Sequence, residues 1–391
     1  MNALAMSSAP ASPAAAAAAT AAAPPRQWPQ RLPLTLAILA LFGWLAWTVS
    51  ARQALLLLVG TGLGAALASP RFGFTTGWRN LVESRDPSGV YGQVILIGLL
   101  ALLSIPLLEH FPETTAALGP LSISLLVGAF VFGGAMQVAD GCGSGQLYKA
   151  GLGLPLNMAI LPMFILGSFL GSVHLNGWLA LGALEPVGLV SELGAGWALG
   201  LTLAGLLVVT LGVGWWSGQA FNLRRIPRRW VWGALALALL AALNLLIAGQ
   251  PWGIVYGFGL WGAKAATSLG LFDPAANAFW SDPGHAERLR QTLLLDVTSI
   301  TNIGILAGAL WVAPRRPAGS GPTPRAQWVA GLVAGFLLGY SSRLAFGCNV
   351  GAMVSGISTG SLHGWLWVPM AFLGSLVGLR VRHWVSGGGA K

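Results

Sequence analysis

Long uncharged apolar runs, separated by short polar or basic stretches, recur along almost the whole chain. Each run is close to the length that a helix needs to cross ~30 Å of hydrocarbon, and a soluble core would not need such runs. The pattern predicts an all-α polytopic integral membrane protein with about nine or ten membrane helices. The candidate spans are residues 32–50, 54–69, 89–108, 121–139, 154–175, 194–216, 230–249, 294–313, 328–346 and 364–380.

Two further apolar segments are interrupted by glycine. They are PWGIVYGFGLWGAKAATSLG at residues 251–270 and PRFGFTTGWRN at residues 70–80. We interpret both as short re-entrant or interfacial elements that enter the membrane from opposite faces.

The chain also contains an internal duplication. VGAFVFGGAMQVADGCGSG at residues 127–145 aligns without a gap with VAGFLLGYSSRLAFGCNVG at residues 333–351, so that Cys142 falls on Cys348. Further along, PMFILGSFLG at residues 162–171 matches PMAFLGSLVG at residues 369–378, with the distance between the copies one residue longer. Unrelated apolar helices share leucine, alanine and glycine through composition, but not a Gly-Cys pair followed at nearly equal distance by Pro-Met and Leu-Gly-Ser. We therefore predict two repeats, at about residues 54–216 and 230–383.

Charge is scarce and unevenly placed along the chain. Apolar residues make up 55% of it and charged residues 8%, yet the net charge is +10. The arginines stand in short clusters between apolar spans and form no basic face with interleaved aromatic residues, which excludes nucleic acid as a partner. Because cytoplasmic loops of membrane proteins are enriched in arginine and lysine, we place the basic loops inside and the acidic loops outside. The inside loops contain Arg71, Arg79, Arg85, Arg224, Arg225, Arg228, Arg229, Arg315, Arg316, Arg325, Arg380 and Arg382, and the outside loops contain Glu109, Glu113, Glu185 and Glu192.

This topology makes the two repeats inverted. The helices around Cys142 are flanked by outside loops, whereas the helices around Cys348 are flanked by inside loops. Inverted repeats that meet through broken helices near the midplane are a common transporter plan, and the breaks mark the binding site. We therefore expect both cysteines to lie along one central path. The expected organisation is a disordered cytoplasmic tail at residues 1–31, a single transmembrane domain at residues 32–383 and a cytoplasmic tail at residues 384–391.

The two Gly-Cys segments suit a small anion that carries a soft atom. A thiol in a dry path is a weak, polarizable donor and acceptor, which favours sulfur or selenium over a hard oxyanion. The neighbouring Gly141, Gly143, Gly145 and Gly347 expose backbone N–H groups, and a helix that begins after such a turn directs its positive end to the same point. Either cysteine alone could also be a small buried apolar residue, but their shared position in both repeats favours a functional pair.

Three polar residues stand close to the cysteines. Asp140 precedes the first Gly-Cys pair, Asn349 follows the second cysteine directly, and Arg343 lies inside an apolar span. Charges at such depth are rare and are usually functional or paired. We include all three residues in the candidate translocation site. The alternatives are snorkelling of Arg343 to the inner surface and a helix-packing hydrogen bond from Asn349.

No enzyme signature is found. The chain has no Walker loop, HExxH, CxxC or nucleophile elbow, so we predict no catalytic residue, no metal and no cofactor. The residues leave two functions open: a permease for a small sulfur-containing anion, and a membrane thiol-disulfide or persulfide relay protein. The relay needs sulfur atoms about 2 Å apart at some stage, whereas the permease needs a continuous path lined by both cysteines. A membrane scaffold would leave Arg343 and Asp140 unexplained.

On these residues the chain resembles the YeeE/YedE family of sulfur-compound membrane transporters. ADGCGSGQLYKAGLG at residues 139–153 is similar to that family's first Gly-Cys loop, and RLAFGCNVGAMVSGISTGSLHGWLWVP at residues 343–369 is similar to its second. PRFGFTTGWRN and YGFGLWGAK are similar to two further family segments. The resemblance implies an hourglass-shaped permease of the bacterial inner membrane, with its N-terminus in the cytoplasm, in which Cys142 and Cys348 pass the terminal sulfur of the substrate through a constriction. Its partners would be the lipid bilayer, the anion and a cytoplasmic sulfur-carrier protein.

The chain departs from the family pattern at one position. Family members active on thiosulfate resemble RFCFT where this chain reads RFGFT, so that a third cysteine is replaced by Gly73. We include Gly73 in the candidate path. The replacement leaves the substrate open between thiosulfate and another sulfur or selenium species.

Overall fold

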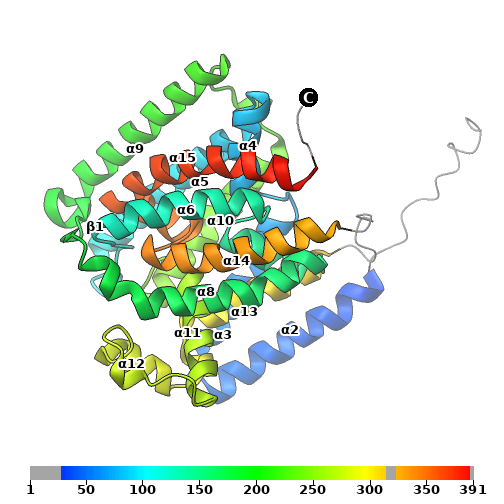
Figure 1. Ribbon diagram of the computed structural model, residues 1–391, viewed down its shortest axis with the longest axis vertical. Coiled ribbons are helices and arrows are strands. Elements are labelled where there is room, and N and C mark those ends of the chain that lie inside the picture. The colour runs from blue at the N-terminus through cyan, green and yellow to red at the C-terminus, as the bar shows by residue number, and fades with distance from the viewer. Residues whose placement is uncertain (1–27, 314–322, 388–391) are drawn as a thin grey trace, which may run out of the picture.

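The computed structural model describes residues 28–313 and 323–387, and almost all of this part of the chain is helical (Figure 1). The strands β1 (Leu121–Ser122) and β2 (Ala183–Leu184) pair antiparallel and form the one sheet of the described residues. The helices are α2 (Trp28–Thr48), α3 (Ala51–Ala68), α4 (Phe74–Ser84), α5 (Ser88–His110), α6 (Ile123–Val138), α7 (Gly143–Gly151), α8 (Pro155–Leu179), α9 (Leu189–Ser217), η2 (Leu223–Arg225), α10 (Arg228–Ala248), α11 (Val255–Ser268), η3 (Pro274–Ala276), α12 (Pro283–Arg290), η4 (Leu293–Leu295), α13 (Val297–Val312), α14 (Arg325–Leu344), the π-helical η5 (Asn349–Gly356) and α15 (Leu362–Val385).

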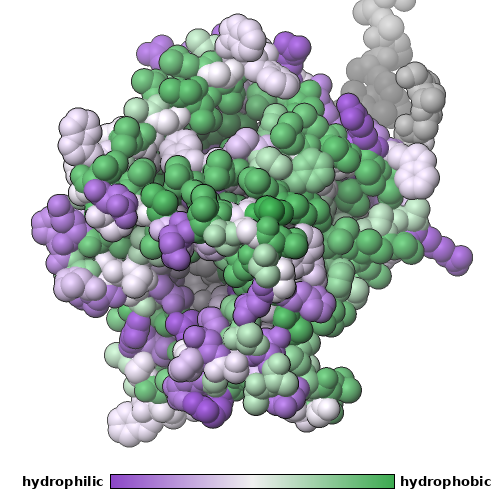
Figure 2. All heavy atoms as spheres, turned by 60° about the vertical axis from the view of Figure 1, so that its left-hand side comes forward, coloured by the Kyte–Doolittle hydropathy of each residue, from purple (hydrophilic) through white to green (hydrophobic). Residues whose placement is uncertain are grey.

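The long helices confirm the predicted membrane fold. Within the described ranges, 9 helical segments are long and apolar enough to cross a membrane, and they correspond to nine of the predicted spans. The remaining predicted span is α13, which is apolar but only 16 residues long. In Figure 2, apolar side chains cover the upper and right-hand parts of the face, and hydrophilic side chains gather on its left side and around the hollow in its lower half. The protein is an all-α, multi-pass membrane protein.

Both ends of the transmembrane domain differ slightly from the predicted boundaries. The helix α2 begins at Trp28, inside the expected N-terminal tail, and includes Pro33, because membrane helices tolerate proline. The helix α15 continues to Val385, two residues into the expected C-terminal tail. Outside the described residues lie 1–27, 314–322 with Arg315 and Arg316, and 388–391.

The duplicated sequence folds into duplicated helix contacts. The helix α6 packs against α15, and α8 packs against α14. A Cβ built on Gly133 would lie 1.9 Å from the Ala371 carbonyl oxygen, and one built on the equivalent Gly339 would lie 2.1 Å from the Phe164 carbonyl oxygen. The helices come this close only because no side chain stands between them.

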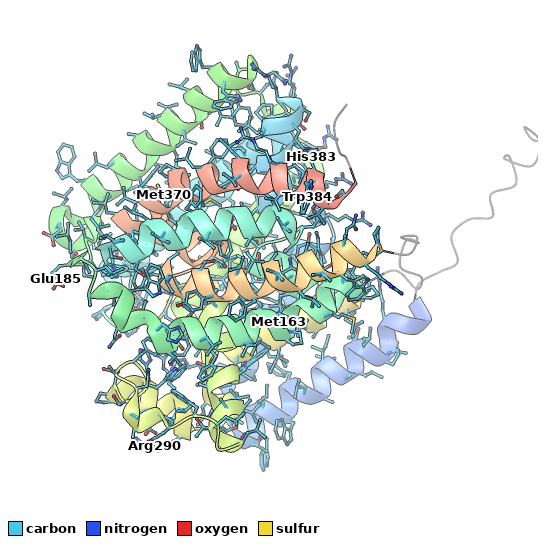
Figure 3. The ribbon with its side chains drawn as sticks, viewed as in Figure 1. Met163, Glu185, Arg290, Met370, His383 and Trp384 are labelled. Carbon is cyan, nitrogen blue, oxygen red and sulfur yellow. The ribbon has the colours of Figure 1, made fainter. Side chains whose placement is uncertain are left out.

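The two copies run in opposite directions. The Ser124 hydroxyl near the start of α6 donates to the Leu344 carbonyl oxygen at the end of α14 over 2.9 Å, so these neighbouring equivalent helices are antiparallel (Figure 1). The β1–β2 pair holds the start of α6 beside the end of α8. Figure 3 shows Glu185 at one end of the bundle and His383 toward the opposite end. This is the arrangement of an inverted repeat.

The segments predicted as short re-entrant elements form α4 and α11. The helix α11 packs against α8, where a Cβ on Gly259 would lie 3.2 Å from the Ser168 hydroxyl oxygen. The helix α4 packs against α5, and the Trp78 indole donates to the Gln93 side-chain oxygen over 2.9 Å. Both short helices therefore bring their first residues next to the Gly-Cys turns.

Candidate functional site

The two Gly-Cys turns share one backbone conformation. Asp140 and the equivalent Phe346 both have a φ of 55°, in the left-handed region that non-glycine residues rarely adopt. Cys142 follows with φ −83° and ψ −169°, and Cys348 with φ −99° and ψ −167°. Backbone strain of this kind persists only where the surrounding structure holds it. Its presence in both copies indicates that the shape of the turn is required.

Each turn starts a short helix whose positive end faces a thiol. The Cys142 carbonyl oxygen accepts from the Gln146 N–H over 2.8 Å, and the Cys348 carbonyl oxygen accepts from the Ala352 N–H over 2.8 Å. The backbone N–H groups of Gly145 and Gly351 lie toward the sulfur atoms of the two cysteines. The N-termini of α7 and η5 are therefore directed at the two thiols, where they favour negative charge.

Cys142 and Cys348 are free cysteines with relative exposures of 1% and 0%. A Cβ built on Gly143, the residue after Cys142, would lie 3.1 Å from the Cys348 sulfur. The second thiol therefore packs against the first residue of α7. The Ser144 hydroxyl lies 3.4 Å from the Cys142 sulfur. The structure thus brings the two predicted cysteines together at the closed centre of the molecule.

The predicted glycines differ in how strictly glycine is needed. Gly347 has a φ of 156°, and a Cβ there would lie 2.5 Å from the Ala352 backbone nitrogen. A Cβ on Gly141 would lie 3.0 Å from the Gln146 amide nitrogen, which is a tight fit. At Gly145 the nearest atom to a Cβ would be the Cys142 sulfur, at 3.7 Å, which is ordinary contact. Space excludes a side chain at Gly347 but not at Gly145.

A cavity of about 420 Å³ ends at Cys348, and we call it the Cys348 vestibule. It lies between α11, α12, α14 and the second Gly-Cys turn. Its lining includes Tyr256, Phe279, His285, Ser342, Arg343, Gly347, Cys348 and Gly351. The volume is sufficient for a small anion with several water molecules.

Arg343 carries the positive charge of this vestibule. Its guanidinium carbon lies 5.0 Å from the centre of the Phe279 ring and 5.6 Å from the centre of the Tyr256 ring, a cation–π arrangement. Its Nε is buried and has no hydrogen-bond partner among the described residues, and no carboxylate of that part of the chain forms an ion pair with it. The aromatic rings hold the guanidinium in place and leave its charge available to an anion.

His285 extends this aromatic cluster. Its ring stacks on Phe279 with centroids 4.1 Å apart, and its Nδ1 lies 3.1 Å from the Tyr256 hydroxyl. Burial and the nearby Arg343 charge lower the pKa of His285. The imidazole is therefore neutral at pH 7.

A second, much narrower cavity of about 10 Å³ ends at Cys142, and we call it the Cys142 vestibule. Such a volume holds about one water molecule. Its lining includes Phe72, Gly73, Phe74, Thr75, Thr76, Asp140, Cys142, Tyr148 and Lys149. Gly73 therefore lies beside Cys142, and a Cβ there would lie 3.1 Å from the Thr76 hydroxyl oxygen. The two vestibules share no lining residue and are separated by the region of the thiols.

Asp140 connects the elements around the narrow vestibule. Its carboxylate lies 2.6 Å from the Arg79 guanidinium of α4, 2.7 Å from the Lys149 ammonium of α7 and 3.2 Å from the Arg382 guanidinium of α15. These three cations hold the carboxylate in place, so its geometry is that of a structural ion cluster. Because one carboxylate faces three cations, the mouth of this vestibule keeps a positive charge.

Phe279 and His285 were not among the predicted site residues. They lie between α11 and α13, in a segment with no counterpart in the first repeat and no recognisable motif. Tyr256 falls in the predicted re-entrant segment, but its sequence gave no sign of a contact with Arg343. A search for aromatic residues near the Gly-Cys copies could not have found them, because the contacts are made only by tertiary folding.

Comparison with known proteins identifies the family. The model of a family described as sulphur transport matches residues 69–377. The thiosulfate transporter TsuA of Spirochaeta thermophila is 26% identical over 328 residues, which cover 79% of this chain and 93% of that protein. The probable transporter YedE of Salmonella typhimurium is 28% identical over 161 residues, and that of Escherichia coli is 26% identical over 181 residues, covering 37% and 42% of this chain and 36% and 41% of those proteins. The chain therefore belongs to the sulphur transport family, the YeeE/YedE membrane transporters.

Proposed function

We propose that the protein is an inner-membrane permease for a small sulfur-containing anion that is passed between Cys348 and Cys142. The observation that carries the proposal is the matched pair of buried thiols, each at the positive end of a short helix and each closing one vestibule. Membership of a sulphur transport family and the similarity to a thiosulfate transporter support the same substrate class.

The anion first meets the charge of Arg343. The wider vestibule admits it with part of its hydration, and the guanidinium, held by Phe279 and Tyr256, forms no ion pair with any described carboxylate. A soft terminal sulfur then contacts the Cys348 thiol through a weak S–H···S hydrogen bond, which costs little to break. Conduction needs binding that is favourable but weak enough to release, so weak contacts in series suit transport.

The anion then passes to the Cys142 thiol, and the backbone N–H groups at the start of α7 offset its charge. Beyond Cys142 it reaches the vestibule lined by Gly73, where the cations around Asp140 leave a positive field. The basic loops favour a cytoplasmic position for this end and for the N-terminus. A cytoplasmic sulfur-carrier protein that receives the anion would dock there.

Uptake of radiolabelled thiosulfate into proteoliposomes tests the proposal. We expect Cys142→Ser and Cys348→Ser each to lower uptake by on the order of tenfold or more, because a hydroxyl is harder and better hydrated than a thiol of similar volume. The double variant should be little worse than either single one, since both thiols act in series. Thr202→Val serves as the control, since Thr202 is buried in α9 and lines neither vestibule.

Two results would contradict the proposal. Wild-type uptake by the double alanine variant would exclude a role for the thiols in transport. A mixed disulfide or persulfide that forms on Cys142 or Cys348 during turnover would favour the relay protein instead.

A further inference from the structure

Asn349 is the most completely unsatisfied polar side chain of the site. It is the first residue of η5, directly after Cys348, and its relative exposure is 0%. Neither its amide nitrogen nor its amide oxygen has a hydrogen-bond partner among the described residues. Burying such a group without a partner costs about 1–3 kcal/mol. Helix capping does not account for it, since no side chain caps η5.

The repeat places this amide beside the other cysteine. The first copy has Gly143 at the position of Asn349. The Cα–Cβ direction at Gly143 points to the Cys348 sulfur, 3.1 Å from a Cβ built there. The two turns share their dihedral angles, and η5 packs against α7. By the internal symmetry of the repeats, the equivalent direction at Asn349 leads toward Cys142, so we place this carboxamide, which has no polar counterpart at Gly143, beside the two thiols.

We infer that the Asn349 carboxamide is the specificity-determining group of the constriction and donates a hydrogen bond to the oxygen end of the anion while its sulfur end contacts a thiol. The inference rests on the proposed permease function. A thiol recognises a soft terminal atom but distinguishes oxygen-bearing anions poorly. The buried amide gains a hydrogen bond only from an anion that has oxygen, so such an anion binds more tightly than one that leaves the amide unpaired. The two groups together select an anion with a soft atom at one end and oxygen at the other.

Thiosulfate and hydrosulfide separate the two kinds of recognition, because both present a soft sulfur atom but only thiosulfate has an oxygen end. The experiment measures radiolabelled thiosulfate uptake into proteoliposomes and its inhibition by unlabelled hydrosulfide. We expect Asn349→Leu to lower thiosulfate uptake by about tenfold or more, the effect of losing one hydrogen bond to a charged group. Inhibition by hydrosulfide should stay within about threefold of the wild-type value, since the thiols are intact.

The matched pair Asn349→Ser and Asn349→Ala controls for packing, because the two differ by one hydroxyl group. We expect the serine variant to retain more thiosulfate uptake than the alanine variant. Thr202 also has a buried polar group without a hydrogen-bond partner among the described residues, but it lines neither vestibule. Thr202→Val removes this hydroxyl group and should leave uptake within about twofold of wild type. Size-exclusion profiles and melting temperatures in detergent establish that each variant is folded.

The possible results are distinguishable. Equal uptake by the serine and alanine variants, or equal loss of thiosulfate uptake and hydrosulfide inhibition in Asn349→Leu, would overturn the role of Asn349. If either result were found while Cys142→Ser and Cys348→Ser were inactive, the permease proposal would stand, but without a role for Asn349. Absence of anion uptake by the wild-type protein would overturn both.

Discussion

Gly347 occupies a backbone conformation that a side chain opposes. Its φ is 156°, and an added Cβ would lie 2.5 Å from the Ala352 nitrogen, whereas an added Cβ at Gly351 would meet no atom within 4 Å. We expect Gly347→Ala to lower the free energy of unfolding by about 1–3 kcal/mol through backbone strain. Gly351→Ala should preserve or slightly raise it, since alanine is favoured over glycine inside a helix. The melting temperatures of the two variants in detergent test this expectation. Equal values would show that the turn rearranges to accommodate the added methyl group.

His285 should make transport dependent on pH. Burial and the charge of Arg343 lower its pKa below the ordinary value of 6.5, against the smaller opposite effect of Asp282, and Arg288 lowers it further. Above pH 6.5 the imidazole is neutral in both the folded and the unfolded protein, so it has no effect on stability. As the pH falls below 6.5, the unfolded chain takes up the proton first, and stability declines until the folded protein is protonated as well.

Protonation also adds a positive charge beside Arg343. The thiosulfate concentration at half-maximal uptake should therefore fall as the pH is lowered below 6.5 in the wild-type protein. His285→Asn can still hydrogen-bond to Tyr256 but does not titrate, and we expect its uptake to change less over the same range. Proteoliposomes with a fixed internal pH give the comparison. Parallel profiles for the two proteins would show that His285 does not affect the anion.

At the scale of the elements, close helix–helix contacts at glycine residues hold the two repeats together. A Cβ on Gly374 of α15 would lie 1.8 Å from the Phe130 carbonyl oxygen of α6, whereas a Cβ on Gly177 of α8 would meet nothing within 4 Å. We expect Gly374→Ala to push α6 and α15 apart and to cost about 1–3 kcal/mol of stability, and Gly177→Ala to be neutral. Thermal unfolding in detergent measures both. Similar melting temperatures of the two variants would mean that the packing of α6 against α15 does not depend on backbone contact at Gly374.

The long helices could be predicted because few backbone structures can cross a bilayer. An apolar run of sufficient length must cross as a helix, since every backbone polar group needs a partner within the segment. The spans around α5, α8 and α10 accordingly begin and end within a few residues of the prediction. The strands β1 and β2 have two residues each and show no period that a sequence could reveal. The helix α12 has a charged sequence that gives no membrane signal.

At the scale of the whole molecule, the duplication predicted the centre of the site but not its entrance. Cys142, Cys348 and their glycines could be found because both copies carry them. The entrance depends on Phe279 and His285, which belong to a segment present only in the second half of the chain. The segment reaches the second Gly-Cys turn because it packs against α8, where the Trp280 indole donates to the Ser172 hydroxyl over 2.9 Å. Comparing the two repeat sequences detects only the residues that both halves share, so site residues present in one half can be identified only from the tertiary structure.

The orientation of the whole molecule in the membrane decides which vestibule faces which side. Glu185 lies just before α9 and Arg225 just after it, so one membrane-spanning helix separates the two positions. Because arginine-rich loops stay in the cytoplasm, we expect a reporter fused after Arg225 to be cytoplasmic and one inserted after Glu185 to be external. Two reporters on the same side would mean that α9 does not cross, which would contradict the predicted topology. If both positions were reversed, the repeats would stay inverted, but the Cys348 vestibule with Arg343 would open to the cytoplasm. The proposed uptake path would then run in the direction of export.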